Sequence, residues 1–495
     1  MMMELKATTV SSWPKLAWVA TLTPGSSEIQ VLHGPVVEVG DGWIAEAVWA
    51  GDFQAGDFDQ TDLVFGSGIR CRGDRVVFVS SGTTFDRLWR CSHGEKTHVS
   101  NSLSALLAVS GLELRDDYPD YSRDVQTICA GLANRISSIP LRGGDATCVY
   151  FNNLTYDGNT LAEEPKPDPA PAFCTYEDYY GFLVRTAERL GSNLADLART
   201  RQIVPVSGVS SGYDSCAAAV ISRHAGCGRT VTIRDSTSLW RGSDSGEPIA
   251  RRLGMSCVEY PRTASHYPME PAIWAGEGHA GIVNWTLFGF PTPLCLFFTG
   301  WHGEKMWDRV CHDHPDPFVR RDTGSLSFCE WRLLQGVFQC PVPFWAARHN
   351  HQTRAITLSE AMVPWYTNKD YDKPIARRIV EEAGVPRRLF GMLKKNSSHE
   401  EAFRWPYSPD ARASFAQYRR QRGKDAPSDR LLRTWQLAAH GESLAYMNLF
   451  AKLGIRKRFR PWLELDPDAS LFTWANGELR ALYARGLASQ PRSGR

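Results

Sequence analysis

The sequence predicts an α/β protein in two parts, a β-rich N-terminal region and a larger region in which strands alternate with helices. Three observations support this prediction. Short runs of β-branched and aromatic residues precede residue 163, a proline-rich stretch follows, and apolar runs then alternate with segments of helical periodicity. A chain of 495 residues is long enough to bury more than one hydrophobic core.

The N-terminal region, residues 1–162, is predicted to consist mainly of strands. Val76–Ser80 and Thr147–Phe151 are apolar runs rich in the residue types that favour strands. Prolines then alternate with other residues from Pro165 to Pro171. Because proline lacks an N–H and favours extended backbone, residues 163–173 are predicted to form a linker.

The region after the linker, residues 174–495, is predicted to hold a parallel sheet covered by helices on both faces. Apolar residues recur at helical spacing over Tyr176–Arg199. The next segments alternate between predicted strands and helices: strand Ile203–Val206, helix Ala217–Ile221, strand Thr230–Ile233, helix Glu247–Leu253 and strand Leu294–Phe298. Such alternation is typical of parallel sheets with crossover helices. From about Asp372 onward the chain is predicted to be mainly helical.

Composition argues against several functional classes. The net charge is +2, so no global field favours nucleic acid or an anionic membrane. No apolar run approaches the roughly 20 residues that span a bilayer, and the first residues lack a signal-peptide pattern. The twelve cysteines have no regular spacing, which indicates reduced thiols in a cytoplasmic protein. Cys311–His314 lacks a second ligand pair at zinc-site spacing and is predicted to be a polar loop.

Ser210–Ser215 carries the strongest chemical signal in the chain. It contains Ser-Ser-Gly-Tyr-Asp-Ser between a predicted strand and a predicted helix. Small residues let the backbone approach an anion, and the N–H groups at a helix start favour phosphate. Asp214 would repel a bare phosphate, so its presence indicates a bridging Mg²⁺. The alternative is an ordinary turn in which the serines cap the helix.

Five segments in the same order resemble the asparagine synthetases and their relatives. Ser210–Ser215 resembles the pyrophosphatase loop Ser-Gly-Gly-x-Asp-Ser of that family, with Ser211 in place of the first glycine. The other four are Ser243–Gly254, similar to an acidic segment and helix, Thr299–Trp307, similar to Ser-Gly-x-Gly-x-Asp-Glu-Leu-Phe, Glu360–Trp365, similar to Glu-x-Arg-x-Pro-Phe, and Lys394–Glu400, similar to a lysine-bearing loop. Each match is weak alone, and the shared order gives the set its weight.

The resemblance implies a fold and a reaction. The N-terminal region would be a degenerate β-rich sandwich similar to an Ntn-hydrolase glutaminase domain. The C-terminal region would be an adenine nucleotide alpha-hydrolase-like (PP-loop) domain with a parallel sheet. In this family ATP activates a carboxylate as an acyl-adenylate, pyrophosphate leaves, and an amine then expels AMP. The implied activity is an AMP-forming carbon–nitrogen ligase that uses ATP and Mg²⁺.

Transferred residue by residue, the resemblance assigns Mg²⁺ to Asp214 and to Glu304, which replaces the usual aspartate. Lys395 would stabilise negative charge at the α-phosphate, with Lys394 as the adjacent alternative. Without the resemblance, both lysines are expected in an exposed basic turn. Lys305 replaces a glutamate of the family, and its role stays open. The implied nucleotide contacts are Ser210, Ser211, Gly212, Asp214, Ser215, Ile233, Gly300 and Gly303.

Trp301 stands where asparagine synthetases carry Glu and β-lactam-forming relatives carry a Tyr of a catalytic dyad. Indole cannot act as a general base, so the sequence departs from both chemistries. Trp301 is predicted either to wall an apolar or aromatic substrate pocket or to serve as a packing residue. His302, His399 and Glu400 are candidate bases for the incoming amine, although an isolated histidine is more often structural.

The N-terminal region departs from the glutaminases of this family, which have cysteine as the first mature residue. Position 2 is Met2, and the first cysteine is Cys71. Val99–Ala108 still resembles the strand-to-helix segment of that domain. The resemblance therefore implies no glutaminase activity and an amine supplied by the substrate, as in β-lactam synthetases and lasso-peptide cyclases.

The expected partners are a small-molecule or peptide carboxylate and an amine, with a precursor peptide or a partner biosynthetic enzyme in the case of peptide cyclisation. No nucleic acid or membrane is expected. Two other hypotheses stay open. A PP-loop RNA-modifying enzyme would use the same loop, yet Cys216 and Cys227 form no Cys-x-x-Cys. A non-catalytic scaffold would account for the departures from the family pattern at Ser211, Trp301, Lys305 and Met362.

Overall fold

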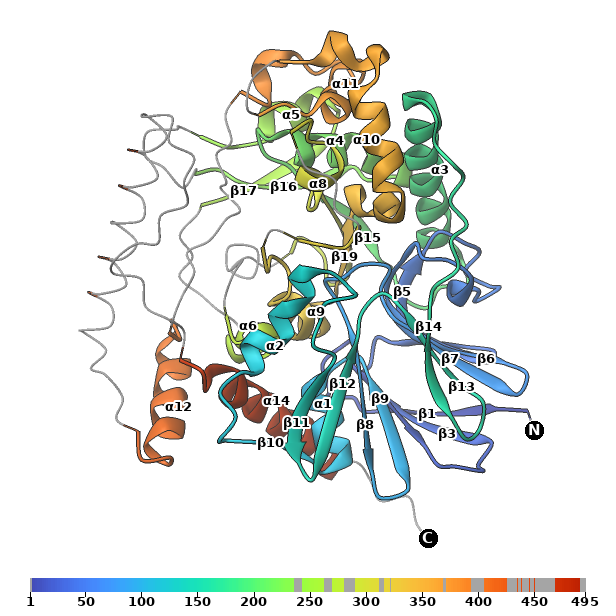
Figure 1. Ribbon diagram of the computed structural model, residues 1–495, viewed down its shortest axis with the longest axis vertical. Helices are drawn as coiled ribbons and strands as arrows, with labels where there is room; N and C mark the ends of the chain where they lie inside the picture. Colours follow the sequence, from blue (N-terminus) through green and yellow to red (C-terminus); the bar gives the residue numbers. More distant parts are fainter. Residues whose placement is uncertain are drawn as a thin grey trace.

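The computed structural model describes residues 2–235, 243–261, 269–279, 290–310, 316–320, 322–367, 371–392, 405–424 and 468–489, together with residues 434, 438, 445 and 449. Within these residues a β-rich N-terminal region leads into a parallel sheet flanked by helices (Figure 1). The predicted combination of a β-rich part and a parallel α/β part is therefore confirmed.

The N-terminal region contains two sheets packed face to face. Its strands are β1 (Glu4–Thr9), β2 (Trp18–Leu22), β3 (Glu28–His33), β4 (Glu38–Gly40), β5 (Trp43–Trp49), β6 (Val64–Arg72), β7 (Arg75–Val79), β8 (Leu88–His93), β9 (Lys96–Ser100), β10 (Glu113–Leu114), β11 (Ser138–Arg142), β12 (Gly144–Val149), β13 (Asn153–Tyr156) and β14 (Leu161–Glu164). One sheet has the order β1-β3-β2-β9-β8-β12-β11-β10 and the other β14-β13-β7-β6-β5-β4. Side chains from both sheets fill the space between them, including Trp18 of the first stacked on Phe78 of the second.

Short helices cover parts of this sandwich: α1 (Leu103–Ser110), α2 (Tyr121–Gln126), η1 (Phe58–Gln60) and η2 (Thr127–Ala130). Helix α1 begins after Ser102, whose hydroxyl accepts a hydrogen bond from the N–H of Ala105, and ends at Gly111 with a φ of 78°. The last described helix, α14 (Leu471–Ala488), packs against α1. The C-terminal end of the described chain therefore returns to the N-terminal sheets.

The second region is built on a five-stranded parallel sheet. Its strands are β15 (Val204–Gly208), β16 (Arg229–Ile233), β17 (Ser256–Tyr260), β18 (Cys295–Thr299) and β19 (Val337–Pro341), in the order β17-β16-β15-β18-β19. Every residue of β18 and of β19 is buried, as expected for strands covered on both faces. The chain starts in the middle of the sheet and extends first to one side and then to the other. The order therefore reverses between β15 and β18.

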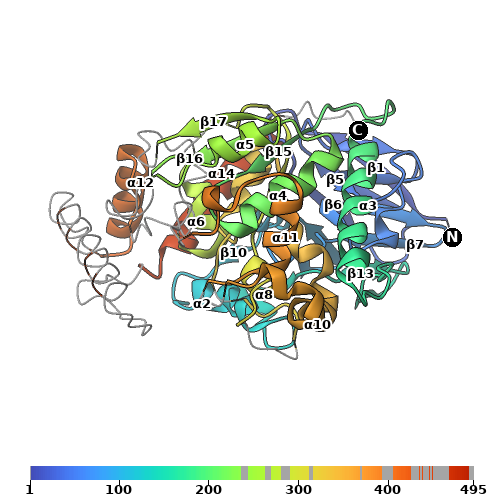
Figure 2. The ribbon, with the colours of Figure 1, turned by 90° about the horizontal axis from the view of Figure 1, so that it is seen from above.

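The second region also contains the helices α3 (Tyr176–Leu194), α4 (Tyr213–Ser222), η3 (Arg223–Ala225), α5 (Glu247–Arg252), α6 (Pro271–Glu277), α8 (Gly303–Met306), α9 (Phe328–Gln335), η4 (Val342–His349), α10 (Asn350–Leu358), η5 (Glu360–Trp365), α11 (Pro374–Glu382), η6 (Arg387–Leu389) and α12 (Pro409–Arg420). Helix α12 lies away from the sheet and packs against α14 (Figure 1). Helix α3 lies against β5 of the N-terminal region (Figure 2). The described elements after Asp372 are helical, as the sequence predicts.

Helix α3 ends earlier than predicted, at Leu194 instead of Arg199. The carboxylate of Asp196 accepts a hydrogen bond from the N–H of Ala198 at 2.8 Å, which forms a local turn that competes with the helix. Arg199 instead forms a buried ion pair with Glu38 of β4 at 2.5 Å. The prediction was wrong here because tertiary contacts and a local side-chain bond end the helix.

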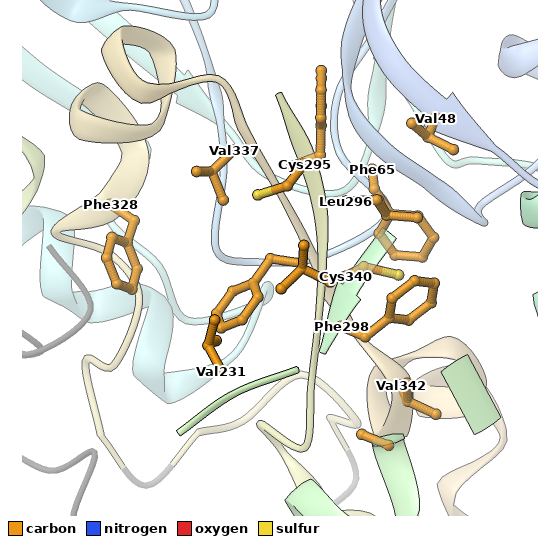
Figure 3. Packing of buried hydrophobic residues seen from close by; sticks show 14 of the residues in the cluster. Val48, Phe65, Val231, Cys295, Leu296, Phe298, Phe328, Val337, Cys340 and Val342 are labelled. Atoms are coloured by element: carbon orange, nitrogen blue, oxygen red, sulfur yellow. The ribbon is translucent and has the colours of Figure 1, made fainter. Parts of the chain in front are cut away.

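The two regions share a continuous contact, which we call the seam: β5, β6 and Asp86 on one side and α9, β18 and β19 on the other. Figure 3 shows Val48 and Phe65 of β5 and β6 beside Leu296, Phe298 and Cys340 of the parallel sheet. The seam also contains charged side chains. Arg332 of α9 donates to Glu46 at 2.8 and 2.9 Å and to Asp86 at 2.7 Å.

The predicted linker is held against the rest of the molecule. Its first residues, Glu163 and Glu164, complete β14. Lys166 is 2% exposed and donates to the side-chain oxygen of Asn153 at 2.5 Å. The predicted linker therefore begins inside a strand, and its proline-rich segment is anchored by a buried amine.

Within the described ranges, no helix is both long and apolar enough to cross a membrane. The cysteines that the structure describes are free thiols. Cys311–His314, predicted to be a polar loop, lies outside the described residues.

Candidate functional site

The predicted phosphate loop lies where the strand order of the parallel sheet reverses. Ser210–Ser215 follows β15, and Gly300–Gly303 follows β18. These two strands are parallel neighbours, so their carboxyl ends meet at the same edge of the sheet. In open α/β sheets this reversal leaves a crevice at the strand ends, which is the usual place for a ligand. The structure therefore brings these two segments together, and a third, Ser243–Gly254, joins them through a bridge between Ser210 and Ser245.

The loop is organised by its own serines. The N–H of Ser210 donates to the Ser215 hydroxyl at 3.1 Å, and the two hydroxyl oxygens lie 2.7 Å apart. The N–H of Gly212 donates to the Ser210 hydroxyl at 3.2 Å. Gly212 is the N-cap of α4 and has extended backbone angles. The side chains thus hold the loop directly before the positive end of a ten-residue helix.

Ser211 uses its side chain differently from the other loop serines. Its N–H donates to the backbone oxygen of Asp244 at 3.1 Å and to the Asp244 carboxylate at 3.2 Å, and its hydroxyl also donates to that carboxylate. Asp244 is 4% exposed. The Ser211 side chain is therefore turned toward Asp244, which belongs to the acidic segment Ser243–Gly254 that the sequence analysis singled out.

Two glycines allow the second segment to approach Asp214 closely. A Cβ on Gly300 would meet the backbone carbonyl of Asp214, and a Cβ on Gly303 would meet its carboxyl group, both closer than the 3.0 Å that real Cβ atoms keep. Glu304, half-buried, directly follows Gly303 in α8. The acid-bearing segments are thus in direct contact, whereas their positions in the chain are far apart.

Lys373 is a site residue that sequence reasoning missed. Its ammonium group forms an ion pair with the Asp214 carboxylate and its side chain is 2% exposed, while that of Asp214 is 21% exposed. The Lys373 nitrogen also lies 5.8 Å from the ring centre of Tyr371. The hydroxyl of Tyr371 accepts a hydrogen bond from the N–H of Tyr213 at 3.3 Å, and burial raises the pKa of Tyr371 well above its usual value. No local pattern around Asp372-Lys373-Pro374 marks this lysine.

Trp301 is packed between two phenylalanines. Its ring centre lies 5.5 Å from that of Phe85 and 5.6 Å from that of Phe328. Phe85 belongs to the N-terminal region, so Trp301 contacts both regions. This arrangement favours the packing interpretation of Trp301.

His302 is a buried residue with a left-handed backbone, at a φ of 73°. Its ring lies 4.9 Å from that of Phe344. Burial lowers the pKa of His302 to about 4, so the imidazole is neutral at pH 7. A base with so low a pKa binds a proton weakly, which argues against His302 as the catalytic base.

The remaining predicted residues are only partly placed. Ile233 is the last residue of β16, and its side chain is buried in the core. Only its backbone groups are therefore placed to contact a ligand at the end of the strand. Lys305 follows Glu304 in α8 and is half-buried. Four predicted residues lie outside the described residues: Lys394, Lys395, His399 and Glu400.

We call the place where β15 and β18 end, with Ser210–Ser215 and Gly300–Glu304, the switch point, and its acids are of the kind that bind a magnesium ion shared with phosphates. In the described ranges, no group of three or more His, Cys, Asp or Glu side chains could hold a metal. Mg²⁺ needs fewer protein ligands, because it is usually bound by one or two carboxylates plus substrate phosphates. Asp214 and Glu304 are two carboxylates of that kind, and the lack of a side chain at Gly303 lets its segment lie directly against the Asp214 carboxyl group.

Comparison with protein-family models and with curated proteins finds no match for this chain.

Proposed function

We propose that the chain is an ATP-dependent, AMP-forming carbon–nitrogen ligase whose active site lies where β15 and β18 end. One observation carries the proposal: Gly300 and Gly303 fit against Asp214 so closely that neither position has room for a side chain. A helix start at the reversal of strand order is a common place for phosphate, and this close packing holds there an acid that can share a cation with it.

The chain's own residues would divide the work of charge stabilisation. The N–H groups at the start of α4 face the strand ends, and the hydroxyls of Ser210 and Ser215, which now bond each other, would turn to donate to phosphate oxygens. Asp214 and Glu304 would hold Mg²⁺, which supplies positive charge next to the triphosphate. Lys373 would offset the negative charge of the departing pyrophosphate once phosphate competes with Asp214 for its ammonium group.

In this proposal a carboxylate is activated by transfer of AMP, pyrophosphate leaves, and an amine completes the amide bond. The resemblance to asparagine synthetases places Lys395 at the α-phosphate, with Lys394 as the alternative, and leaves His399 and Glu400 as candidate bases. We also propose the finer fold that this resemblance implies, a PP-loop domain after a degenerate glutaminase-like sandwich.

The thiols of the N-terminal region support a ligase without glutaminase activity. Burial raises the pKa to about 11 for each of four cysteines: Cys71, Cys91, Cys129 and Cys148. A thiol with so high a pKa is protonated at pH 7 and is a poor nucleophile. The amine is therefore proposed to come from the substrate, either a small molecule or a peptide.

A non-catalytic scaffold is the second candidate, and the Lys373 ion pair is the observation that favours it. A lysine that already neutralises Asp214 competes with a metal ion for the same carboxylate. If the pair is permanent, the loop would be a structural turn.

Calorimetric titration of the full chain with ATP and MgCl₂ tests the proposal. We expect binding that weakens at least about tenfold, or about 1.4 kcal/mol, in Asp214→Asn and in Lys373→Met. Asp74→Asn and Lys96→Met remove the same groups from exposed positions of the N-terminal region and should bind ATP normally. Failure of the unaltered chain to bind ATP would favour the scaffold. ATP–pyrophosphate exchange with a panel of carboxylates then tests adenylation.

A further inference from the structure

A second cavity lies away from the switch point, at the junction of the two regions and the linker. Its volume is about 340 Å³, within the range of small-molecule sites. Its walls come from the connection between β5 and β6, from the proline-rich segment and from α3. The residues that line it are distinct from Ser210–Ser215 and Gly300–Glu304. The cavity is therefore independent of the proposed ATP site.

One face of α3 supplies two arginines to this cavity. The lining residues Phe182, Arg185, Thr186 and Arg189 are spaced by three or four positions, so they lie on the same side of the helix. Both arginines are exposed to solvent, whereas Phe182 and Thr186 are buried. Among the residues that the structure describes, neither Arg185 nor Arg189 has an ion-pair partner. Two guanidinium groups thus line one wall, and Asp178 of the same helix, an acid that interacts with Arg185, forms no direct ion pair with it.

The opposite walls combine hydrogen-bonding and apolar groups. Asp57 is the acid among the lining residues, and its carboxylate accepts a hydrogen bond from the Trp49 indole at 3.3 Å. With two arginines and one aspartate, the residues that line the cavity carry a net charge of +1. The Thr61 oxygen accepts from the N–H of Leu63 at 3.0 Å, which leaves its O–H free to donate. Pro169 and Pro171 present apolar rings and have no N–H to compete for a ligand.

We infer that this cavity binds a small organic anion, whose carboxylate or phosphate group meets Arg185 and Arg189 and whose apolar body packs on Pro169 and Pro171. Guanidinium groups bind both oxyanions through paired hydrogen bonds, and a positively charged lining favours them over neutral compounds. Because the walls belong to both regions and to the linker, the bound anion would stabilise the folded chain as a whole. The site does not depend on the proposed ligase activity.

Calorimetric titration of the full chain, without nucleotide, tests this inference with two probes, succinate and inorganic phosphate. We expect at least one to bind and its affinity to fall at least about tenfold in the double variant Arg185→Ala/Arg189→Ala. The matched control Arg251→Ala/Arg252→Ala removes the same charge from exposed positions of α5 and should bind as the unaltered chain does. Tighter binding of succinate identifies a carboxylate ligand, and tighter binding of phosphate identifies a phosphorylated one.

Three results would overturn the inference. The first is that neither probe binds at concentrations up to about 10 mM, where a Kd in the millimolar range would still be seen. The second is that the control variant loses as much affinity as the Arg185→Ala/Arg189→Ala variant, which would mean that the net charge of the protein is responsible. The third is that binding disappears in Lys373→Met but persists in Arg185→Ala/Arg189→Ala, which would mean that the anion binds at the switch point instead. ATP binding is measured separately, so failure of this inference can be told apart from failure of the proposed function.

Discussion

The seam and the switch point both place charged groups beside the parallel sheet, but in different surroundings. At the seam, the nitrogen atoms Nε, Nη1 and Nη2 of Arg332 all donate to Glu46 or Asp86, and all three side chains are at most 2% exposed. At the switch point, Lys373 is equally buried but its partner Asp214 is 21% exposed. The loop beside Asp214 also has half-buried serines.

This difference indicates different roles for the two sets of charges. A network whose members are all buried cannot exchange partners without exposing an unpaired charge, so it serves the folded structure. A pair with one solvent-accessible member can exchange that partner for a ligand at a smaller cost. Variants at the seam should therefore change stability, and variants at the switch point should change ligand binding.

The largest expected effect is at the seam. Arg332→Ala would leave Glu46 and Asp86 buried without their cation, and we expect the free energy of unfolding to fall by about 3–5 kcal/mol. Urea denaturation measures this change. Arg251→Ala, which removes a guanidinium with a 78% exposed side chain, should change it by less than about 0.5 kcal/mol. A loss below about 1 kcal/mol in Arg332→Ala would remove the distinction between seam and surface.

The next effect depends on pH and concerns the anchored linker. Burial lowers the pKa of Lys166 to about 7, whereas an unfolded lysine titrates near 10.5. Between these pH values the unfolded chain binds a proton that the folded chain does not, so the free energy of unfolding rises with pH.

Lys166→Met should therefore lack a rise of about 4 kcal/mol that the unaltered chain shows between pH 7 and pH 10.5. Urea denaturation at a series of pH values measures the difference between the two proteins. Identical pH profiles would mean that Lys166 is hydrated in solution.

Gly303→Ala tests the switch point. Its Cβ would collide with the Asp214 carboxyl group, so we expect a loss of about 1–3 kcal/mol of stability from overpacking. We also expect ATP to bind at least about tenfold more weakly to the folded variant. Gly228→Ala is the matched control, because a Cβ there meets nothing within 4 Å. Unchanged ATP affinity in Gly303→Ala would place the nucleotide elsewhere.

The smallest expected effect concerns α3, the helix that touches both regions. Thr175 caps it in a capping box with Asp178. Thr175→Ala should lower the free energy of unfolding by about 1 kcal/mol and leave ATP affinity unchanged. Thr160→Ala, at an exposed turn, is the comparison in thermal unfolding. A change in ATP affinity in Thr175→Ala would show that the two regions are coupled through α3.

Local patterns in the sequence predicted much of the parallel sheet. The apolar runs Thr230–Ile233 and Leu294–Phe298 became β16 and β18 within one residue at either end, and the Ser/Gly turn falls between β15 and α4. These predictions held because the alternation of apolar runs and turn residues depends on neighbours in the chain. The same local signals located the loop before any tertiary contact was considered.

Only the tertiary structure decided which side chains meet. Lys373 pairs with Asp214 across 159 positions, and Arg332 pairs with Glu46 across 286. Trp301 had two interpretations in the sequence, and Phe85 of the distant N-terminal region favours one of them. Lys166, in a segment that the sequence predicts to be a linker, is buried. The physical reason is that periodicity reports how a residue faces its own helix or strand, whereas pairing and burial depend on which elements the complete fold brings together.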